Sequence, residues 1–464
     1  MKNEIKNICC IGAGFVGGPT MAVIADRCPH IKVNVVDTNP RRIEDWNNDN
    51  LSKLPIYEPG LDKIIERTRN KNLTFSCDVV EAIKNAEMIF ISVNTPTKTK
   101  GMGAGQASDL KYVEACARQV ASNARGHTIV VEKSTLPVRT AEVIKTILEA
   151  SKKYDDDNSN HRTFDVLSNP EFLAEGTAIN DLENPDRVLI GGESKKAIDS
   201  LRDIYKYWVS EEKILITNVW SSELAKLTAN AFLAQRVSSI NSISALCEET
   251  GADIREVSRA IGSDTRIGSK FLDSGPGFGG SCFKKDILNL VYLSNYFGLP
   301  EVASFWNSVV DLNNWHQKRI SRLITKKLFG TLSDKRIAIL GFAFKSNTND
   351  TRESSAIQIC KDLLDEGAIL YIHDPKVRAS QIEKDLNLPP NRINRETLMS
   401  NSNEGSWVHV KETINAFKDA DAAIILTEWD EYSYINWEEV SFYMRKPAWV
   451  FDTRAIVDIS KIKK

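Results

Sequence analysis

The chain of 464 residues carries a formal net charge of −2, with 42% hydrophobic and 26% charged residues. This length exceeds one ordinary hydrophobic core, so we expect two or three domains. The near-zero net charge excludes a bulk electrostatic reason for nucleic-acid binding, and any anionic ligand must be held by local Lys and Arg side chains. Eight scattered cysteines without a CxxC pair argue against a disulfide framework or a metal site, and for a reducing, cytoplasmic location.

The N-terminal segment combines a basic start with a mostly apolar stretch. Lys2 and Lys6 precede ICCIGAGFVGGPTMAVIA, which has the charge pattern of a signal peptide. Four glycines and Pro19 make this stretch a poor continuous helix, and a strand pattern follows at 32–37. We therefore expect a turn between a strand and a helix. No other apolar run approaches membrane length, so no membrane partner is expected.

The same stretch has the spacing of a dinucleotide-binding motif. IGAGFVGG places glycines at Gly12, Gly14 and Gly17, which permit a tight turn, close approach of a pyrophosphate and close helix–strand packing. The next strand ends at Asp37, 20 residues after Gly17, where a carboxylate can bond the adenosine ribose hydroxyls. Because it would repel a 2′-phosphate, the pattern predicts NAD rather than NADP.

Short apolar runs alternate with helical patterns through residues 1–210. Continuous apolar runs are typical of buried parallel strands, so the alternation predicts a doubly wound α/β sheet. The runs cover 7–12, 32–37, 88–93, 127–134, 164–170 and 187–192. Polar stretches at 98–109 and 152–162 are predicted surface loops.

The middle of the chain is predicted to be helical. From Trp220 to Glu249 the sequence has no Gly or Pro, and the pattern stops at Gly251. A helix of this length spans about 45 Å, enough to join two domains and carry a subunit contact. More helical sequence follows to about Phe329.

The last third begins again with a strand and a glycine at 335–345. Further strand patterns lie at 368–375, 422–429 and 448–454, and the polar segment 389–406 is a predicted insertion loop. We therefore predict an α/β fold with two Rossmann-like doubly wound domains joined by a long central helix. The predicted domains are 1–210, which binds NAD, 211–330, which is helical and dimerising, and 331–464.

GFGGSCFKKD, residues 277–286, sets Cys282 behind a run of small residues. A single hydride transfer needs no thiol. A thiol becomes useful when an aldehyde must be oxidised further, because it adds to the carbonyl and leaves a thioester that water can cleave. Asp286 would share a helical face with Cys282 if a helix begins near the cysteine. On this segment alone, a buried structural cysteine is the competing interpretation.

Three other segments point to the same chemistry. SNPEFLAEG ends a strand with Glu171 and Glu175, at the sheet edge where doubly wound folds place their sites. Lys226 and Asn230 lie one turn apart on the long helix. They are either part of a solvated helix face or a buried polar pair. EKSTLPVR ends another strand with Thr135, in a position to border the nicotinamide.

Seven motifs together resemble the UDP-glucose/GDP-mannose dehydrogenase family and fit its UDP-glucose branch best. They are GAGFVGG, SVNTPT, EKSTLPVR, SNPEFLAEG, KLTANAFLAQR, GFGGSCFKKD and FAFKSNTNDTRES, in the family's order. The resemblance extends from residue 5 to about residue 458. It implies oxidation of the C6 alcohol of UDP-glucose to a carboxylate with two NAD+ and one water, by a homo-oligomer that is a dimer or a hexamer.

The resemblance also implies catalytic roles. Cys282 matches the nucleophile that forms a thiohemiacetal and then a thioester, and Lys226 matches the lysine that stabilises negative charge on the reacting oxygen. Asp286 matches the acid that helps to activate the hydrolytic water. Glu171 is the implied acid/base partner, and Thr135 and Asn230 position water and substrate.

Binding contacts follow from the same resemblance. The implied NAD contacts are Gly12, Ala13, Gly14, Phe15, Val16, Gly17, Asp37, Arg42, Val93, Asn94, Thr95, Pro96, Thr97, Ser134, Thr135, Leu136, Glu175, Cys282, Lys285 and Arg352. The implied substrate contacts are Glu171, Phe172, Leu173, Ala174, Glu175, Lys226, Asn230, Arg266, the 273–279 loop with Asp273, Phe278 and Gly279, and Phe344, Lys345 and Arg454. Arg266 matches an arginine that enters the site from a neighbouring subunit. A diphosphate needs such local cations.

Some residues depart from the family pattern. Lys284 stands where Pro or Gln is frequent, Asn349 and Thr453 replace common glycines, and Asp273 occupies a position that is basic in animal-type members. The alternatives are a sister enzyme acting on GDP-mannose or a UDP-N-acetylhexosamine, single hydride transfer with a structural Cys282, and a non-catalytic NAD-responsive scaffold. The amino-sugar branch usually shows GGHC where this chain has GGSC, which favours UDP-glucose.

Overall fold

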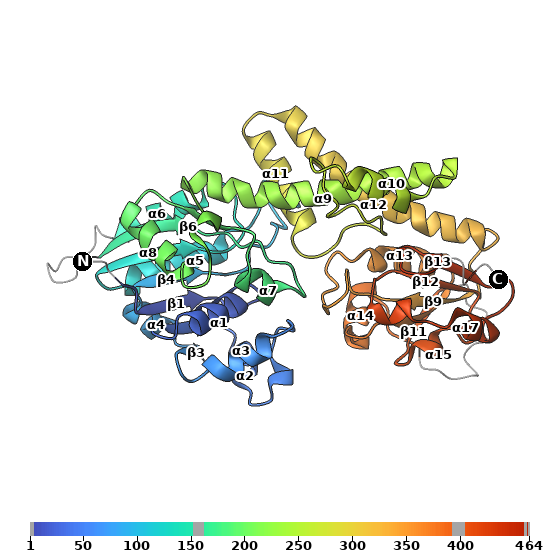
Figure 1. Cartoon of the computed structure of the whole chain (residues 1–464), viewed down its shortest axis with the longest axis horizontal. Helices are drawn as coiled ribbons and strands as arrows, with labels where there is room; N and C mark the ends of the chain where they lie inside the picture. Colours follow the sequence, from blue (N-terminus) through green and yellow to red (C-terminus); the bar gives the residue numbers. More distant parts are fainter. Residues whose placement is uncertain (1–3, 152–161, 392–403, 459–461, 463–464) are drawn as a thin grey trace. The chain divides into compact units, whose positions relative to one another are not determined.

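The computed structural model describes residues 4–151, 162–391, 404–458 and 462, and the chain divides into two compact units, Met1–Ala229 and Asn230–Lys464 (Figure 1). The predicted loops at 152–162 and 389–406 fall mostly outside these described ranges. The predicted loop at 98–109 forms turns, and its base is closed by a bridge between Thr97 and Ser108. Within the described ranges, no helix has the length and apolar character needed to cross a membrane.

The N-terminal unit is built on an eight-stranded sheet in the order β3-β2-β1-β4-β5-β6-β7-β8. Its strands are β1 (Asn7–Ile11), β2 (Lys32–Val36), β3 (Leu73–Ser76), β4 (Met88–Ile91), β5 (His127–Glu132), β6 (Thr163–Ser168), β7 (Val188–Gly191) and β8 (Ile214–Thr217). Neighbouring strands are parallel except β6 and β7, which pair antiparallel through Ser168 and Gly191. The predicted doubly wound α/β fold is confirmed, with this one antiparallel contact.

Helices cover both faces of this sheet, because its strands are apolar on both sides. One face packs against α1 (Gly17–Arg27), α2 (Pro40–Asn47), α3 (Leu61–Thr68), α7 (Ala178–Glu183) and α8 (Lys195–Tyr205). The other packs against α4 (Val79–Asn85), α5 (Lys111–Asn123) and α6 (Thr140–Ser151). Two separate apolar cores result. The predicted site motifs lie at the carboxyl ends of the parallel strands, outside these two cores.

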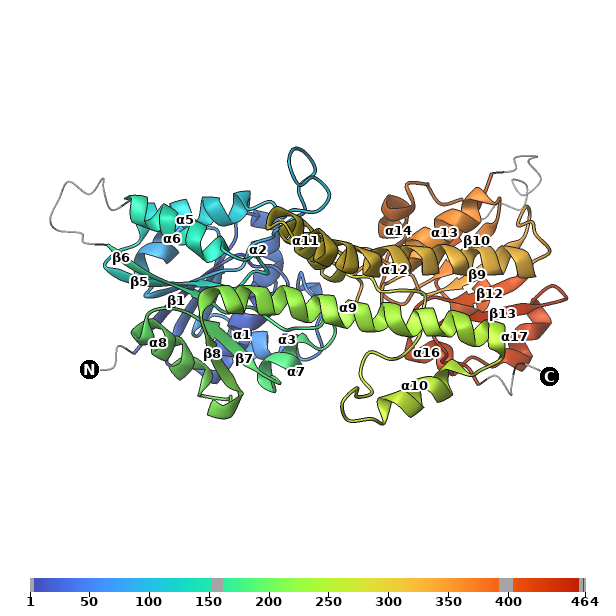
Figure 2. The ribbon, with the colours of Figure 1, turned by 90° about the horizontal axis from the view of Figure 1, so that it is seen from above.

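The long helix α9 (Val219–Thr250) has 32 residues and runs without interruption (Figure 2). Its limits agree with the predicted helix from Trp220 to Glu249. The boundary between the two compact units falls inside it, after Ala229. The domain boundaries predicted at 210 and 330 stay predictions.

The C-terminal unit holds a five-stranded parallel sheet in the order β11-β10-β9-β12-β13. Its strands are β9 (Arg336–Leu340), β10 (Ile369–His373), β11 (Ser406–His409), β12 (Ala422–Ile425) and β13 (Trp449–Asp452). One core joins this sheet to the end of α12 (Pro300–Lys327), α13 (Ser355–Asp365), α14 (Ala379–Leu386), α15 (Thr413–Ala416), α16 (Asp430–Ser433) and α17 (Trp437–Tyr443). A second cluster joins α9 to α11 (Phe283–Tyr296) and α12, and α10 (Ile254–Gly262) follows α9.

The first strand of each sheet, β1 and β9, leads into the same strand-glycine turn. The Gly12 N–H donates to Val36 O at 2.7 Å, and the Gly341 N–H donates to His373 O at 2.8 Å. Both glycines have positive φ, +111° and +93°, which disfavours other residues. A Cβ on Gly341 would lie 2.3 Å from Thr427 Cβ. The second, degenerate Rossmann-like unit is therefore confirmed.

Candidate active site

The three glycines of the N-terminal turn have three different environments. A Cβ on Gly12 would lie 2.2 Å from Ser92 O, so this position must be glycine for the turn to close against β4. A Cβ on Gly17 would lie 2.0 Å from Gly12 O, which makes it the helix–strand packing position. At Gly14 no atom lies within 4 Å of the Cβ position, so its open face is free for a pyrophosphate. The turn therefore fits a dinucleotide.

The Asp37 carboxylate accepts hydrogen bonds from groups around this turn. Its Oδ2 accepts the Ala13 N–H and the Arg42 guanidinium, each at 3.0 Å, and its Oδ1 accepts the Asn39 N–H at 2.9 Å. The Trp46 indole N–H donates to Ala13 O at 2.9 Å from the same side. Asp37 and Arg42, both predicted NAD contacts, are thus brought to the Gly12 turn.

The motifs SVNTPT and EKSTLPVR meet at the ends of β4 and β5. The Ser134 hydroxyl donates to Val93 O at 2.7 Å, and the Thr95 hydroxyl donates to Thr135 O at 3.0 Å. Neighbouring parallel strands end at one edge of the sheet, which explains why motifs about 40 residues apart in sequence come together. The structure therefore places Thr135 on a loop held beside the second predicted NAD segment.

Glu171 and Lys226 form a buried ion pair. Lys226 Nζ lies 3.1 Å from Glu171 Oε1, and the side chains are only 4% and 7% exposed. Burial by itself raises the pKa of Glu171, but Lys226, the Leu173 amide and Lys133 together hold that pKa below its ordinary value. Glu171 is consequently an anion at neutral pH.

A buried polar network beside this pair was not identified from the sequence. Lys133 Nζ donates to Asn169 Oδ1 at 2.9 Å and to the Tyr205 hydroxyl at 3.2 Å, and that hydroxyl donates to Asn169 at 2.7 Å. Lys133 and Asn169 each directly follow an apolar strand. A polar residue in that position was the signal that could have revealed them.

In the C-terminal unit, Cys282 is the N-cap residue of α11 and is half-buried. The Asp286 N–H donates to Cys282 O at 2.8 Å and closes the first helical turn. The predicted helix start at the cysteine is confirmed, and Cys282 lies at the positive end of the helix dipole. Asp286 is buried, and the Asn230 amide donates to its Oδ2 at 2.6 Å.

The other cysteines are poorer nucleophiles or lie elsewhere. Burial raises the pKa of Cys9 and Cys28 to about 12 and that of Cys116 to about 11. Burial also raises the pKa of Cys10 and Cys360, and Cys77 is exposed on a loop before α4. Buried thiols of raised pKa are inert. Cys247 is also buried, within α9, so Cys282 is the half-buried cysteine and the candidate nucleophile.

The loop that carries Cys282 packs closely on the FAFKSNTNDTRES segment. A Cβ on Gly279 would lie 2.5 Å from Glu353 O and 2.9 Å from Phe344 Cβ. The Gly280 N–H, at a φ of +84°, donates to Arg352 O at 2.8 Å. Lys284, which has no role from its sequence, forms an ion pair with Glu353 at 2.9 Å. The small residues therefore allow the cysteine loop to approach this segment.

The predicted substrate cations have different surroundings. Arg454 is largely buried, donates to Leu426 O and Phe344 O, and pairs with Glu428 at 3.1 Å. Arg266 is exposed and paired with Asp264 within the same chain, and Asp273 is exposed. Arg454 therefore lies next to Phe344, and its contact with substrate stays a prediction. The role of Arg266 toward a neighbouring subunit stays a prediction.

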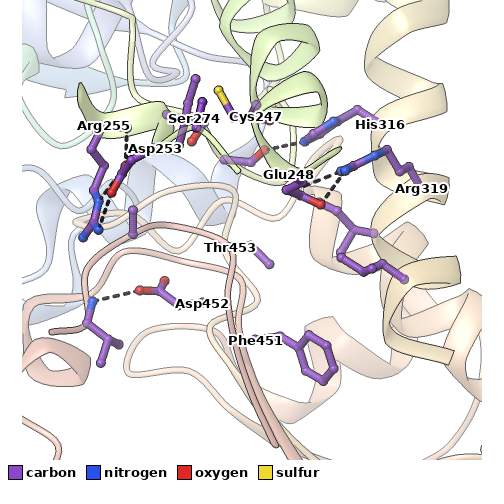
Figure 3. Close-up of a pocket in the computed structure, with 18 of the residues that line it drawn as sticks. Cys247, Glu248, Asp253, Arg255, Ser274, His316, Arg319, Phe451, Asp452 and Thr453 are labelled. Carbon is purple, nitrogen blue, oxygen red and sulfur yellow. Dashed lines mark hydrogen bonds and ion pairs between the residues drawn. The ribbon is translucent and has the colours of Figure 1, made fainter. Parts of the chain in front are cut away.

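A pocket of about 570 Å³ lies in the C-terminal unit between α9, α12 and the end of β13 (Figure 3). Ser274 and Gly275 of the predicted substrate loop line it, together with Asp452 and Thr453. The buried His316 ring holds this loop, because its Nε2 lies 3.0 Å from Gly275 O. Burial lowers the pKa of His316, so the ring is neutral and its N–H donates to the carbonyl.

Comparison with known proteins identifies the family. Residues 6–209 match the NAD binding domain of the UDP-glucose/GDP-mannose dehydrogenase family, 220–315 its central domain and 338–459 its UDP binding domain. The fold and the dinucleotide turn define an NAD-binding α/β oxidoreductase. The chain belongs to the UDP-glucose/GDP-mannose dehydrogenase family.

Individual relatives are similar over nearly their whole length. UDP-glucose 6-dehydrogenase from Gallus gallus is 56% identical over 463 residues, which cover 98% of this chain and 90% of the relative. The Drosophila melanogaster enzyme is 54% identical, covering 98% and 94%. Among solved structures, a UDP-glucose dehydrogenase from Pyrobaculum islandicum has a TM-score of 0.82 at 29% identity, covering 99% of this chain and 96% of that one.

Proposed function

We propose that this chain is an NAD-dependent dehydrogenase that oxidises UDP-glucose to UDP-glucuronate in two successive steps. The observation that carries the proposal is the identity of 52–56% to UDP-glucose 6-dehydrogenases over 98–99% of the chain, with Cys282, Lys226 and Asp286 in place. The NAD-binding turn and the UDP-binding domain supply the two ligands that this reaction needs.

In the first oxidation, the C6 carbon loses a hydride and the C6 hydroxyl loses its proton. Bound NAD+ supplies the hydride acceptor. Lys226 stabilises the developing alkoxide with its ammonium charge, and the ionised Glu171 accepts a proton from the reacting groups. Because the pair is buried, its charges act with little screening by water.

The second oxidation needs the thiol. The Cys282 sulfur adds to the aldehyde carbon, and the resulting thiohemiacetal loses a hydride to a second NAD+ and a proton to a base, which leaves a thioester. Water then attacks the thioester carbonyl, and the C–S bond breaks. Asp286, held by the Asn230 amide, takes the proton of this water. The thiol returns to its starting state, and the product is a carboxylate.

We also propose the ligands, the oligomeric state and the location of the protein. We expect NAD at the Gly12 turn, no metal and no nucleic-acid partner, a homo-oligomer that is a dimer or a hexamer, and a cytoplasmic location. The mass in solution measures the oligomeric state directly.

Turnover on a panel of nucleotide sugars tests the substrate. Purified enzyme is assayed by NADH absorbance with UDP-glucose, UDP-N-acetylglucosamine, UDP-N-acetylmannosamine and GDP-mannose at equal concentration. UDP-glucose is expected to give the highest kcat/KM. A last place for UDP-glucose would support the sister enzymes instead, and the absence of NADH from every sugar would support the non-catalytic alternative.

A further inference from the structure

Two buried carboxyl groups, Glu132 and Glu223, face each other in the N-terminal unit. Glu132 is the last residue of β5, Glu223 lies near the start of α9, and their exposures are 1% and 3%. Strand pairing sets Glu132 opposite Ser168, whose hydroxyl accepts a hydrogen bond at 3.0 Å from Ser222, the neighbour of Glu223, and each carboxyl acts on the pKa of the other. Among the described residues, no N–H or O–H donor of another residue reaches either carboxyl oxygen of Glu132. A hydrogen bond between two carboxyls requires a proton on one of them.

The contacts of Glu223 decide which group carries this proton. Its Oε2 accepts the Arg139 N–H at 2.7 Å, and its Oε1 accepts the Ala141 N–H at 2.8 Å. Burial raises the pKa of Glu223, but the amides of Ala141 and Arg139 oppose this rise and favour its ionised form, whereas Glu132 has no such donors. Burial and then repulsion by Glu223 raise the pKa of Glu132 well above its ordinary value. Glu132 is therefore the protonated donor and Glu223 the carboxylate acceptor.

The Glu223 carboxylate binds the segment where the Thr135 loop meets α6. Arg139 ends the loop that carries Ser134, Thr135 and Leu136, and Ala141 lies in the first turn of α6. A carboxylate on these amides caps the positive end of α6. Glu223 also lies three residues before Lys226 on α9. The same carboxylate thus joins the Thr135 loop to the helix of Lys226.

The charged groups around the pair have partners of their own. Lys133 donates to Asn169 and Tyr205, and Lys226 pairs with Glu171. The Arg139 guanidinium lies over the Trp220 ring at 5.4 Å. Two buried lysines, Lys133 and Lys226, lie near three buried carboxyl groups, those of Glu132, Glu171 and Glu223. The positive and negative charges are equal only if one carboxyl is protonated. The charge balance supports a single shared proton.

We propose that the Glu132–Glu223 pair is a positioning device, in which protonated Glu132 fixes the Glu223 carboxylate and this carboxylate fixes the Thr135 loop against the helix of Lys226. The proposal rests on the proposed function for the roles of Thr135 and Lys226. Neither glutamate is assigned a contact with substrate or cofactor. Both act through the residues that they hold.

Substitutions at the two positions are expected to be asymmetric. Glutamine is isosteric with a protonated carboxyl and can donate to Glu223, so E132Q is expected to keep kcat and NAD affinity within about twofold. Leucine has a similar size but no donor, so E132L is expected to lower kcat about tenfold or more and to weaken NAD binding. E223Q can accept only one of the two amides and is expected to show a similar loss, with weaker NAD binding. Equal effects of E132Q and E132L would overturn the proposal.

Thermal unfolding measured against pH tests the shared proton independently of activity. A carboxyl whose pKa is raised in the folded state contributes stability that is fully present below its ordinary pKa and is lost as the pH rises through the raised pKa. E132Q does not titrate at this position. The Tm of E132Q minus that of the wild type is therefore expected to grow by about 2 °C or more between about pH 5 and about pH 8. A constant difference would contradict a proton on Glu132.

Two of these measurements test the Glu132–Glu223 pair independently of the proposed reaction. NAD binding, measured by fluorescence quenching, and the pH dependence of Tm need no sugar substrate. If the wild type does not oxidise UDP-glucose, the proposed function fails, and the comparison of E132Q with E132L in NAD affinity still decides the positioning role.

Discussion

At the scale of single residues, the thiol of Cys282 differs from every other cysteine in its surroundings. It is half-buried at the start of α11, whereas Cys9, Cys28 and Cys116 are buried with raised pKa values. We expect C282S to lower the steady-state rate of NADH formation at least about 10³-fold, because serine cannot form the thioester. C77S removes an exposed thiol and is the matched control, with unchanged activity expected. Wild-type turnover by C282S would rule out the covalent role.

The Glu171–Lys226 pair gives a second prediction at this scale. Removal of one partner leaves the other charge buried, so E171Q is expected to lower the free energy of unfolding by about 3–5 kcal/mol at neutral pH. The pKa of Glu171 is lowered, so its contribution is present above its ordinary pKa and is lost as the pH falls through the lowered value. The cost of E171Q is therefore expected to shrink under acid conditions in urea denaturation.

A surface ion pair supplies the control for this measurement. Arg27 and Glu183 lie 2.6 Å apart, with side chains 40% and 25% exposed. E183Q is expected to cost at most about 1 kcal/mol, because solvent screens an exposed pair. An equal cost for E171Q and E183Q would show that Lys226 is solvated rather than buried with its partner.

At the scale of elements, the glycines before Cys282 set the position of its loop. Gly279 has no space for a Cβ, because the backbone oxygen of Glu353 would lie 2.5 Å away and the Glu353 backbone cannot move freely. G279A is expected to displace the loop and lower kcat about tenfold or more in the NADH assay, since displacements near 1 Å are costly to catalysis.

The neighbouring Lys284 provides the comparison within the same segment. Its ion pair with Glu353 joins side chains that are 36% and 50% exposed. K284Q is expected to change stability by less than about 1 kcal/mol and to leave kcat unchanged. A larger loss from K284Q than from G279A would mean that the ion pair, rather than close packing, positions the cysteine loop.

The elements also show what the sequence could predict. The helix α9 was predictable from 30 residues without Gly or Pro, and the Gly12 turn from its spacing. The strands β3, β8 and β11 were missed, because β3 and β8 have exposed positions and β11 begins at Ser406, the last residue of the segment predicted to be a loop. Lys226 and Asn230 suggested one polar pair. They contact Glu171 and Asp286 instead, and such partners depend on packing between distant segments.

At the scale of the whole molecule, the chain contains the same α/β unit twice, but only one copy has the complete glycine motif. Where the first turn has Ala13 and Gly14, the second has Phe342 and Ala343, and both of their N–H groups donate to Asp374. This carboxylate also accepts the Lys376 and Val377 amides and the Trp429 indole. Its acceptor capacity is used within the protein, which leaves the first unit as the place for NAD.

A single NAD site and a four-electron oxidation together predict the stoichiometry of the complete enzyme. In the proposed two-step reaction, the first NADH leaves and a second NAD+ binds while the sugar is held at the aldehyde level as the Cys282 adduct. With limiting UDP-glucose and excess NAD+, we expect two NADH per sugar in the absorbance end point and no free aldehyde trapped by a hydrazine reagent. A yield of one NADH, with aldehyde trapped in equal amount, would show that the reaction stops at the first hydride transfer and that Cys282 has a structural role.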